Sequence, residues 1–427
     1  MMNHEAYRSW LALSEGQAQL QQLYGQGEGV FSSQSARCLR LIDRHQAAFG
    51  SGPLCLISAP GRTEIVGNHT DHNRGRVLAA AVNLDTLAAA SPRADMTVRL
   101  QSEGYSPLEI SLSQLDPKPG EEGSTAALIR GVAARMADLG HKIGGFDAAV
   151  SSQVLHGSGL SSSAAFEMAM VGVLDALYNG FSLGAQLRAQ VGKYAENVYF
   201  GKPSGLMDQM ASSVGGLVTM DFATDDPQIT ALPFSFAASG FHLVVVDTRG
   251  HHGDLTPAYS AIQAEMQAVA ESMGAEVLRE RSLTDLLDAL PVIRQKTGDR
   301  AVLRALHFYH ENQRVTKAVA ALKTEDLPLF FRMVRESGLS SWTLLQNLYT
   351  ETESQPLALA LALAQESLQG EGACRVHGGG FAGTTLNFVP DGKIQAFTRL
   401  MDGLFGPDCC HVLDVRSQGV VWLGAKA

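Results

Sequence analysis

Residues 157–165 of this chain read GSGLSSSAA and separate two apolar runs that differ in periodicity. The run before them, residues 146–154, is short and predicts a strand. The run after them predicts a regular helix, because its apolar side chains recur every three or four residues, at Phe166, Met170, Val173, Leu174 and Leu177. We call residues 157–165 the serine loop, and we expect it to lead from a strand directly into the first turn of a helix.

The composition of the serine loop fits the binding of a phosphate group. Glycine allows the backbone to approach a ligand closely, and the start of a helix directs unpaired N–H groups at an anion. Serine hydroxyls can bind phosphate or a metal ion. A flexible glycine–serine connection is the alternative interpretation. The chain contains neither the P-loop motif Gly-x-x-x-x-Gly-Lys-Ser/Thr nor a His-Arg-Asp catalytic loop, which excludes P-loop proteins and protein kinases.

A second segment, residues 60–72, concentrates polar side chains between glycines, and we call it the polar segment. Its polar members are Arg62, Glu64, Asn68, His69, Asp71 and His72. They offer donors and acceptors for the hydroxyls of a polyol. A solvated loop with a satisfied histidine is the alternative. Pro60, Gly61 and Gly67 favour a shaped site, because they restrict or release the backbone at fixed points.

Two further segments carry candidate residues. Residues 377–383 read HGGGFAG, and we call them the glycine loop. A strand is expected after this loop, at residues 385–389, so its Gly-x-Gly-x-x-Gly pattern does not fit a Rossmann fingerprint, which precedes a helix. A loop that closes beside a nucleotide and a plain tight hairpin both remain possible. Glu196 is expected near the end of a helix, and Asp208 follows a glycine-rich turn, where an aspartate is often only a helix cap.

Composition limits the class of protein. The chain has 427 residues, 45% of them hydrophobic and 18% charged, and a net charge of −10 without any cluster of Lys or Arg. A nucleic-acid or anionic-membrane partner is therefore not expected, and no obligate protein partner is evident. The five scattered cysteines predict reduced thiols and a cytoplasmic location. No signal peptide is recognised, and the longest apolar run, residues 356–364, is far shorter than the roughly 20 residues that span a bilayer.

The remaining patterns predict an α+β protein of two lobes, because runs of strands and runs of helices replace strict alternation. Helices are expected at residues 5–24, 35–49, 125–139, 183–200 and 393–405, and residues 257–369 are expected to be mainly helical. Strands are expected at residues 54–58, 77–90, 98–100, 217–222 and 241–247, as a strand–turn–strand at 373–390, and as two strands within 409–423. The boundary is placed near Gly215, which gives lobes of residues 1–215 and 216–427.

Four segments, taken together and in their order along the chain, resemble those of galactokinases, members of the superfamily that includes homoserine, mevalonate and phosphomevalonate kinases. They are the polar segment, the serine loop, residues 205–209 and the glycine loop. The resemblance covers residues 35–425 and implies a fold with the active site between two lobes. It implies transfer of the γ-phosphate of ATP to the 1-hydroxyl of galactose with Mg²⁺. The matching positions imply catalytic roles for Asp208 and Arg62, and metal or phosphate binding by Ser163, with Ser162, and Glu196.

The same resemblance implies the remaining site residues. Sugar contacts are implied for Asn68, His69, Asp71, Gly205 and Tyr259. ATP contacts are implied for Gly157, Ser158, Gly159, Leu160, Ser161, Ser162, Ser163 and Ala164.

The chain also departs from the family pattern. Glu64 and Asn68 stand where Asn and Glu are usual, and His72, Ser204 and His377 replace Tyr, Cys and a small hydroxyl residue. Since residues 64 and 68 would be neighbours on a helical turn, we expect the exchange to keep one carboxylate and one amide together, with Asn68 bonding a sugar hydroxyl. Two alternatives stay open, a kinase for a related sugar such as galacturonate and a non-catalytic sugar sensor. The intact serine loop favours an enzyme.

Overall fold

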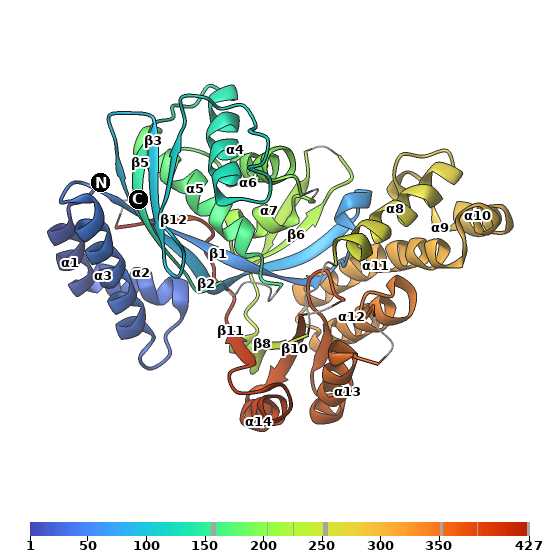
Figure 1. Ribbon diagram of the computed structural model, residues 1–427. Helices are drawn as coiled ribbons and strands as arrows, with labels where there is room; N and C mark the ends of the chain where they lie inside the picture. The colour runs from blue at the N-terminus through green and yellow to red at the C-terminus, as the bar shows by residue number, and fades with distance from the viewer. Residues whose placement is uncertain are drawn as a thin grey trace.

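The computed structural model describes residues 1–154, 159–202, 204–224, 226–250, 255–350, 353–381 and 383–424. Helices pack on two sheets, and this mixed architecture confirms the predicted α+β class. Figure 1 shows the N-terminal helices at one side of the larger sheet, α8 to α11 at the opposite end, and the smaller sheet with α13 and α14 below.

The larger sheet has eight strands in the order β12-β1-β2-β5-β3-β4, with β6 and β7 joined to β2. The strands are β1 (Cys55–Val66), β2 (Arg76–Pro92), β3 (Thr97–Ser102), β4 (Leu108–Ser111), β5 (Phe146–Ser152), β6 (Leu217–Asp221), β7 (Gln228–Leu232) and β12 (Val421–Leu423). All pairs are antiparallel except β3 with β5. The long strand β2 pairs with β1 along one side and with β6 and then β5 along the other, so it connects three other strands of this sheet.

Both faces of the larger sheet are covered by helices. The first face carries α1 (His4–Ala12), α2 (Ser14–Tyr24) and α3 (Val30–Phe49), and the second carries α4 (Thr125–Asp138), α5 (Ser162–Tyr178), α6 (Ala185–Tyr194) and α7 (Met207–Val214). Successive side chains of a strand point to opposite faces. Leu56 accordingly packs with the N-terminal helices, whereas Ile57 packs with α4 and α5. Burial on both sides explains why β1 is apolar at its start rather than alternating.

The smaller sheet has the order β11-β8-β10-β9, all antiparallel. Its strands are β8 (Phe241–Asp247), β9 (Ala373–Val376), β10 (Thr384–Pro390) and β11 (Cys410–Leu413). The helices of this part are α8 (Thr256–Ser272), α9 (Leu283–Asp288), α10 (Leu290–Thr297), α11 (Asp299–Lys323), α12 (Leu327–Ser340), α13 (Pro356–Leu368) and α14 (Ile394–Phe405). Val245 and Phe388 of this sheet share a core with Leu78 and Ala80 of β2, so the two sheets are packed through a common apolar layer.

The structure refines several predicted elements. The helix expected at residues 5–24 is two helices, interrupted at Leu13, and residues 77–90, for which one strand or two are expected, belong to one long strand. The helix expected at 183–200 is α6 followed by a π-helix, Ala195–Phe200. Strands β4 and β7 were not anticipated. In the described part of the chain, no helix is long and apolar enough to cross a membrane.

The predicted lobe boundary near Gly215 lies immediately before β6. Strands β6, β7 and β12 follow this boundary in sequence, yet all three hydrogen-bond into the larger sheet. The division into residues 1–215 and 216–427 therefore stays a prediction about folding units, and it does not coincide with the division between the two sheets.

Candidate active site

Arg62 and Asp208 form an ion pair where β1 meets α7. Nε of Arg62 donates to Oδ1 of Asp208 at 2.8 Å, and Nη2 donates to Oδ2 at 2.7 Å. This two-point geometry fixes the planes of both groups, which a single contact would not do. The Arg62 side chain is 7% exposed and that of Asp208 is 23% exposed, so the carboxylate is the member of the pair that reaches solvent. Asp208 lies in the first turn of α7, where the helix dipole favours a negative charge.

The described part of the serine loop wraps around this pair. The backbone N–H of Arg62 donates to the carbonyl of Leu160 at 3.0 Å, and Nη1 donates to the carbonyl of Gly159. Ser161 caps α5 in a left-handed conformation, with φ 58°, and its hydroxyl donates to Oδ2 of Asp208 at 2.6 Å. The loop therefore joins the start of α5 to the ion pair. Gly157 and Ser158, two of the predicted phosphate contacts, lie outside the described residues.

The surroundings of Asp208 keep it ionised. Burial alone would raise the pKa of this carboxyl, but the positive charge of Arg62 and the hydrogen bonds from Arg62 and Ser161 outweigh burial. The pKa of Asp208 is therefore lowered from its usual value. A carboxylate with a lowered pKa holds a hydrogen-bond donor well but is a weak base.

Glu196 is the centre of a second polar cluster. Its Oε1 accepts from Ser163 Oγ at 3.2 Å and from Lys202 Nζ at 3.0 Å. Its Oε2 accepts from Ser204 Oγ at 2.5 Å and from Gln209 Nε2 at 2.8 Å. Glu196 lies in the π-helix that ends α6, a local widening often found at functional sites. The cluster places a carboxylate and a hydroxyl, both hard oxygen ligands, at the first turn of α5.

Asp71 and Gly205 are in direct contact across the site. A Cβ atom on Gly205 would overlap Oδ2 of Asp71, so the carboxylate occupies the space of a missing side chain. Burial raises the pKa of Asp71 to about 6, and the negative charge of Asp208 adds to the rise. Asp71 therefore lies close enough to Asp208 for the two carboxylates to repel each other.

The exchanged pair, Glu64 and Asn68, is also in contact, as predicted, but on no helix. Glu64 lies near the end of β1 and Asn68 in the turn after it, and Asn68 Nδ2 lies 3.1 Å from Oε1 of Glu64. The same Nδ2 donates to the carbonyl of Gly378 at 2.8 Å, and Oδ1 accepts from Asn347 at 2.9 Å. We expect Asn68 to bond a sugar hydroxyl. For this, one of its hydrogen bonds within the protein has to break so that the sugar can take the place of that partner.

The glycine loop closes on the polar segment and on the serine loop. His69 Nε2 lies 3.1 Å from the carbonyl of Gly379, and the buried His377 bridges Thr63 and Thr384 at 3.0 Å each. A Cβ atom on Gly378 would lie 3.4 Å from the backbone of Gly159. The structure thus brings together the polar segment, the glycine loop and the described part of the serine loop.

Tyr259, predicted as a sugar contact, lies against the glycine loop. Its hydroxyl donates to the carbonyl of Gly380 at 2.9 Å, and a Cβ atom on Gly379 would lie 2.5 Å from its ring. Its ring also meets Phe381 edge-on. The structure groups Tyr259 with His69 and Asn68 around this loop, and it groups Asp71 and Gly205 with Asp208.

Several polar residues of the site were missed in the sequence. Lys202 and Ser204 stand in the glycine-rich turn before α7, and Gln209 lies in the first turn of α7, so their closeness in sequence to Asp208 was a usable signal. Asn347 and Arg375 come from the helical part and from β9, and nothing in their local sequence marks them. Arg375 is fully buried, and its Nη2 lies 3.1 Å from Oε1 of Glu64.

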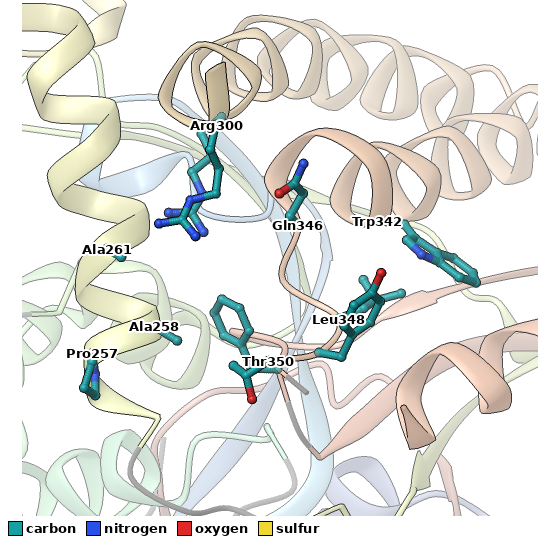
Figure 2. Close-up of a pocket in the computed structure, with 11 residues that line it drawn as sticks. Pro257, Ala258, Ala261, Arg300, Trp342, Gln346, Leu348 and Thr350 are labelled. Atoms are coloured by element: carbon teal, nitrogen blue, oxygen red, sulfur yellow. The ribbon is translucent and has the colours of Figure 1, made fainter. Parts of the chain in front are cut away.

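A cavity of about 640 Å³ lies between α8, α11 and residues 342–350, on the side of the glycine loop that carries Phe381. Figure 2 shows Arg300 projecting into it from one side and Leu348 from the other. Arg300 and Arg304 share the carboxylate of Glu265, at 2.5 and 2.9 Å. Neither Arg62 nor Asp208 lines this cavity, so it is separate from the ion pair.

Comparisons with known proteins agree with this arrangement. The galactokinase galactose-binding signature matches residues 43–92, and the GHMP kinases N terminal domain matches residues 127–216. A galactokinase of Streptomyces coelicolor is 33% identical over 368 residues, which cover 85% of this chain and 92% of the relative. A galactokinase of Streptomyces lividans is 33% identical over 350 residues, 81% of this chain and 84% of the relative.

Solved structures show the same fold. A crystal structure of Lactococcus lactis galactokinase complexed with galactose matches with a TM-score of 0.78 at 24% identity, covering 89% of this chain and 98% of that one. The mevalonate kinase of Methanococcus jannaschii matches with a TM-score of 0.62 at 14% identity, covering 85% and 99%.

Proposed function

The chain belongs to the galactokinase family of ATP-dependent sugar kinases, and from that premise we propose that it phosphorylates galactose at the 1-hydroxyl, with Asp208 and Arg62 at the reacting centre. The observation that carries this assignment is the two-point ion pair between these residues, at 2.8 and 2.7 Å, bound in turn by the serine loop. This pair supports the proposal, because its carboxylate can accept from the sugar hydroxyl and its cation can stabilise the transferred group.

Asp208 orients the attacking hydroxyl. Phosphoryl transfer depends chiefly on positioning and on charge stabilisation, not on strong base catalysis. Because its pKa is lowered, Asp208 accepts a hydrogen bond from the 1-hydroxyl and takes up the proton only as the new bond to phosphorus forms. Arg62 has five N–H donors, of which Asp208 and Gly159 accept three. Its charge stabilises the negative oxygens of the transferring phosphoryl group.

Glu196 and Ser163 are the proposed ligands of Mg²⁺, and the serine loop is the proposed binding site for the phosphates of ATP. The donor set fits this ion, since a carboxylate and a hydroxyl are hard oxygen ligands. When bound, Mg²⁺ neutralises negative charge on the phosphate oxygens. Ser204 and Gln209 hold Oε2 of Glu196 from the other side, which fixes the orientation of the carboxylate.

Galactose rather than galacturonate is the proposed sugar, because the site is already negatively charged and galacturonate carries a carboxylate of its own. The site already contains two carboxylates that repel each other, Asp71 and Asp208, and the charge of Asp208 adds to the rise that burial causes in the pKa of Asp71. A sugar with its own carboxylate would add a third negative charge. Asp71 is the proposed acceptor for the sugar hydroxyls, and His69, Gly205, Tyr259 and Asn68 complete the proposed set.

An ADP-release assay over a panel of sugars tests this proposal. We expect a higher kcat/KM for galactose than for galacturonate, and Asp208→Asn should lower turnover by at least about 100-fold, because catalytic groups of this kind contribute that much. Asp116→Asn, at an exposed position, is the matched control and should leave turnover unchanged. Galacturonate as the better substrate, or an active Asp208→Asn variant, would contradict the proposal.

Galactose binding without any ADP release by the unaltered chain would instead identify a sugar sensor.

The cytoplasmic location and the lack of an obligate protein partner stay predictions. All five cysteines are free thiols, which supports a reducing compartment for this chain.

A further inference from the structure

Two adjacent cysteines and an aspartate form a cluster away from the ion pair of Arg62 and Asp208. Asp402 lies in the last turn of α14, Cys409 directly precedes β11, and Cys410 is the first residue of β11. Strand β11 is one of the two edge strands of the smaller sheet, and Figure 1 shows it with α14 at the lower end of the molecule. Cys409 is buried and Cys410 is half-buried, so the cluster can be reached from solvent through Cys410 and Asp402.

The distance between the two sulfurs is that of two ligands on one metal ion. Sγ of Cys409 lies 3.8 Å from Sγ of Cys410. Two Zn–S bonds of about 2.3 Å at a tetrahedral angle span about 3.8 Å. A disulfide would require about 2.0 Å. One ligand atom from each of Asp402, Cys409 and Cys410 lies within 4.8 Å of the others, so all three residues are grouped closely enough to share one ion.

The backbone holds this arrangement in place. Asp408 adopts a left-handed conformation, with φ 58°, and turns the chain back toward α14. The backbone N–H of Cys409 then donates to Oδ1 of Asp402 at 3.1 Å. An acidic side chain in the last turn of a helix meets the negative end of the helix dipole, which is an unfavourable position for an isolated carboxylate. A cation bound beside Asp402 would offset the negative charge of the carboxylate and the negative end of the helix dipole.

We propose that Asp402, Cys409 and Cys410 form a binding site for a thiophilic divalent cation of the Zn²⁺ or Cd²⁺ class. Binding forms two metal–sulfur bonds and one metal–oxygen bond, and each thiol releases its proton to solvent. Three protein ligands leave the fourth tetrahedral position to water, which is the arrangement of an open site rather than of a closed structural one. The cation would link α14 to β11 and stabilise the folded chain by mass action.

A titration of the reduced full-length chain with Cd²⁺ tests the site. The ultraviolet charge-transfer band of a cadmium–thiolate bond reports thiolate ligands only. We expect this band to saturate at one Cd²⁺ per chain and to be lost in Cys409→Ser and in Cys410→Ser. Cys55→Ala, which removes a buried thiol elsewhere, is the matched control and should keep it. An absent band, or one that survives both serine substitutions, would overturn the proposal.

A second measurement needs no cysteine variant. Alkylation of Cys410 by iodoacetamide, followed by mass spectrometry, should be slowed by Zn²⁺ in the unaltered chain, and the slowing should be reversed by a chelator. Asp402→Asn should raise the Zn²⁺ concentration required for protection. Equal alkylation rates with and without Zn²⁺ would overturn the proposal even if the serine variants did not fold.

Discussion

The carboxylate of Asp71 occupies the space where a side chain on Gly205 would lie. Gly205 does not have a positive φ, so the backbone conformation does not demand glycine there. Glycine is required at position 205 by packing, since the turn before α7 must approach Asp71 closely. This contact places Asp71 beside Asp208, three residues after the glycine, and so joins the sugar-binding part of the site to its reacting centre.

We predict that Gly205→Ala folds but binds galactose weakly. The methyl group would displace only the end of the Asp71 side chain, so the melting temperature should change little. The displaced carboxylate would lose a charge-assisted hydrogen bond worth about 1.5–3 kcal/mol, which corresponds to a roughly 10- to 100-fold weaker affinity. Calorimetric titration with galactose measures this change. Gly184→Ala is the matched control, because a Cβ atom there meets nothing within 4 Å; unchanged galactose affinity in Gly205→Ala would refute the role of Asp71.

A pH titration of galactose binding should show the ionisation of Asp71. Its pKa is raised to about 6, first by burial and then by the charge of Asp208. The ionised carboxylate accepts hydrogen bonds from sugar hydroxyls, so galactose affinity measured without ATP should fall as the pH drops through about 6. Asp71→Asn should bind weakly at every pH and lose this dependence. If the unaltered chain binds galactose equally at pH 5 and pH 7.5, Asp71 does not contact the sugar as an anion.

The ionisation of Asp71 affects folding stability in the opposite direction from galactose binding, because stability rises as the pH falls. A carboxyl with a raised pKa in the folded state binds its proton more tightly than in the unfolded chain, where the pKa is about 3.9. The folded state is therefore favoured as the pH falls from about 6 to about 4. Compared with Asp71→Asn, the unaltered chain should gain free energy of unfolding over this interval, measured by denaturant titration at each pH.

The candidate site was predictable where its residues are consecutive in the sequence. Glycines and serines between a strand and a periodic helix indicated the serine loop, and its described residues lie at the start of α5. Asn347 and Arg375 could not be found in this way, because only tertiary packing brings them to Asn68 and Glu64. Their own segments read as an ordinary helical stretch and an ordinary strand.

The fold was predictable where apolar patterns are strong. Strands β4 and β7 were missed because they are short and partly exposed, which leaves too little periodicity to distinguish them from loops. The proximity of Glu64 and Asn68 was predicted for the wrong reason. A β-bulge between Glu64 and Val66, followed by Gly67 with φ 117°, turns the chain back on itself and brings the two side chains together without a helix.

Glu196→Gln should raise the Mg²⁺ concentration that gives half-maximal activity by about tenfold or more, since even indirect partners of a metal typically contribute that much. The substitution keeps the size of the side chain and removes its charge. Galactose binding without ATP should stay unchanged, because Glu196 contacts the start of α5 and not the polar segment. Glu109→Gln, at an exposed position, is the control. An unchanged Mg²⁺ requirement would exclude Glu196 as a ligand.

The last prediction concerns the exchanged pair and Arg375. Glu64 and Arg375 are both buried, and Nη2 of Arg375 lies 3.1 Å from Oε1 of Glu64. Burial raises the pKa of Glu64, although the charge of Arg375 opposes the rise. Glu64→Asn would leave Arg375 with Glu311 as its nearest carboxylate, at 4.0 Å. Removing one partner of a buried pair costs about 3–5 kcal/mol, and we expect a loss of that size in the free energy of unfolding.

Asn68→Glu alone should also destabilise the chain, because it places a second carboxylate beside Glu64 and removes the amide donor to Gly378. The double variant, Glu64→Asn with Asn68→Glu, again has one carboxylate and one amide at these two positions, which are in contact with each other. Its loss should therefore be smaller than the sum of the two single losses, by roughly 1–3 kcal/mol. Denaturant unfolding of all four chains gives this coupling energy directly. Additive losses would show that a carboxylate at position 68 does not replace the one at position 64 as the partner of Arg375, and that the exchange is not a compensated one.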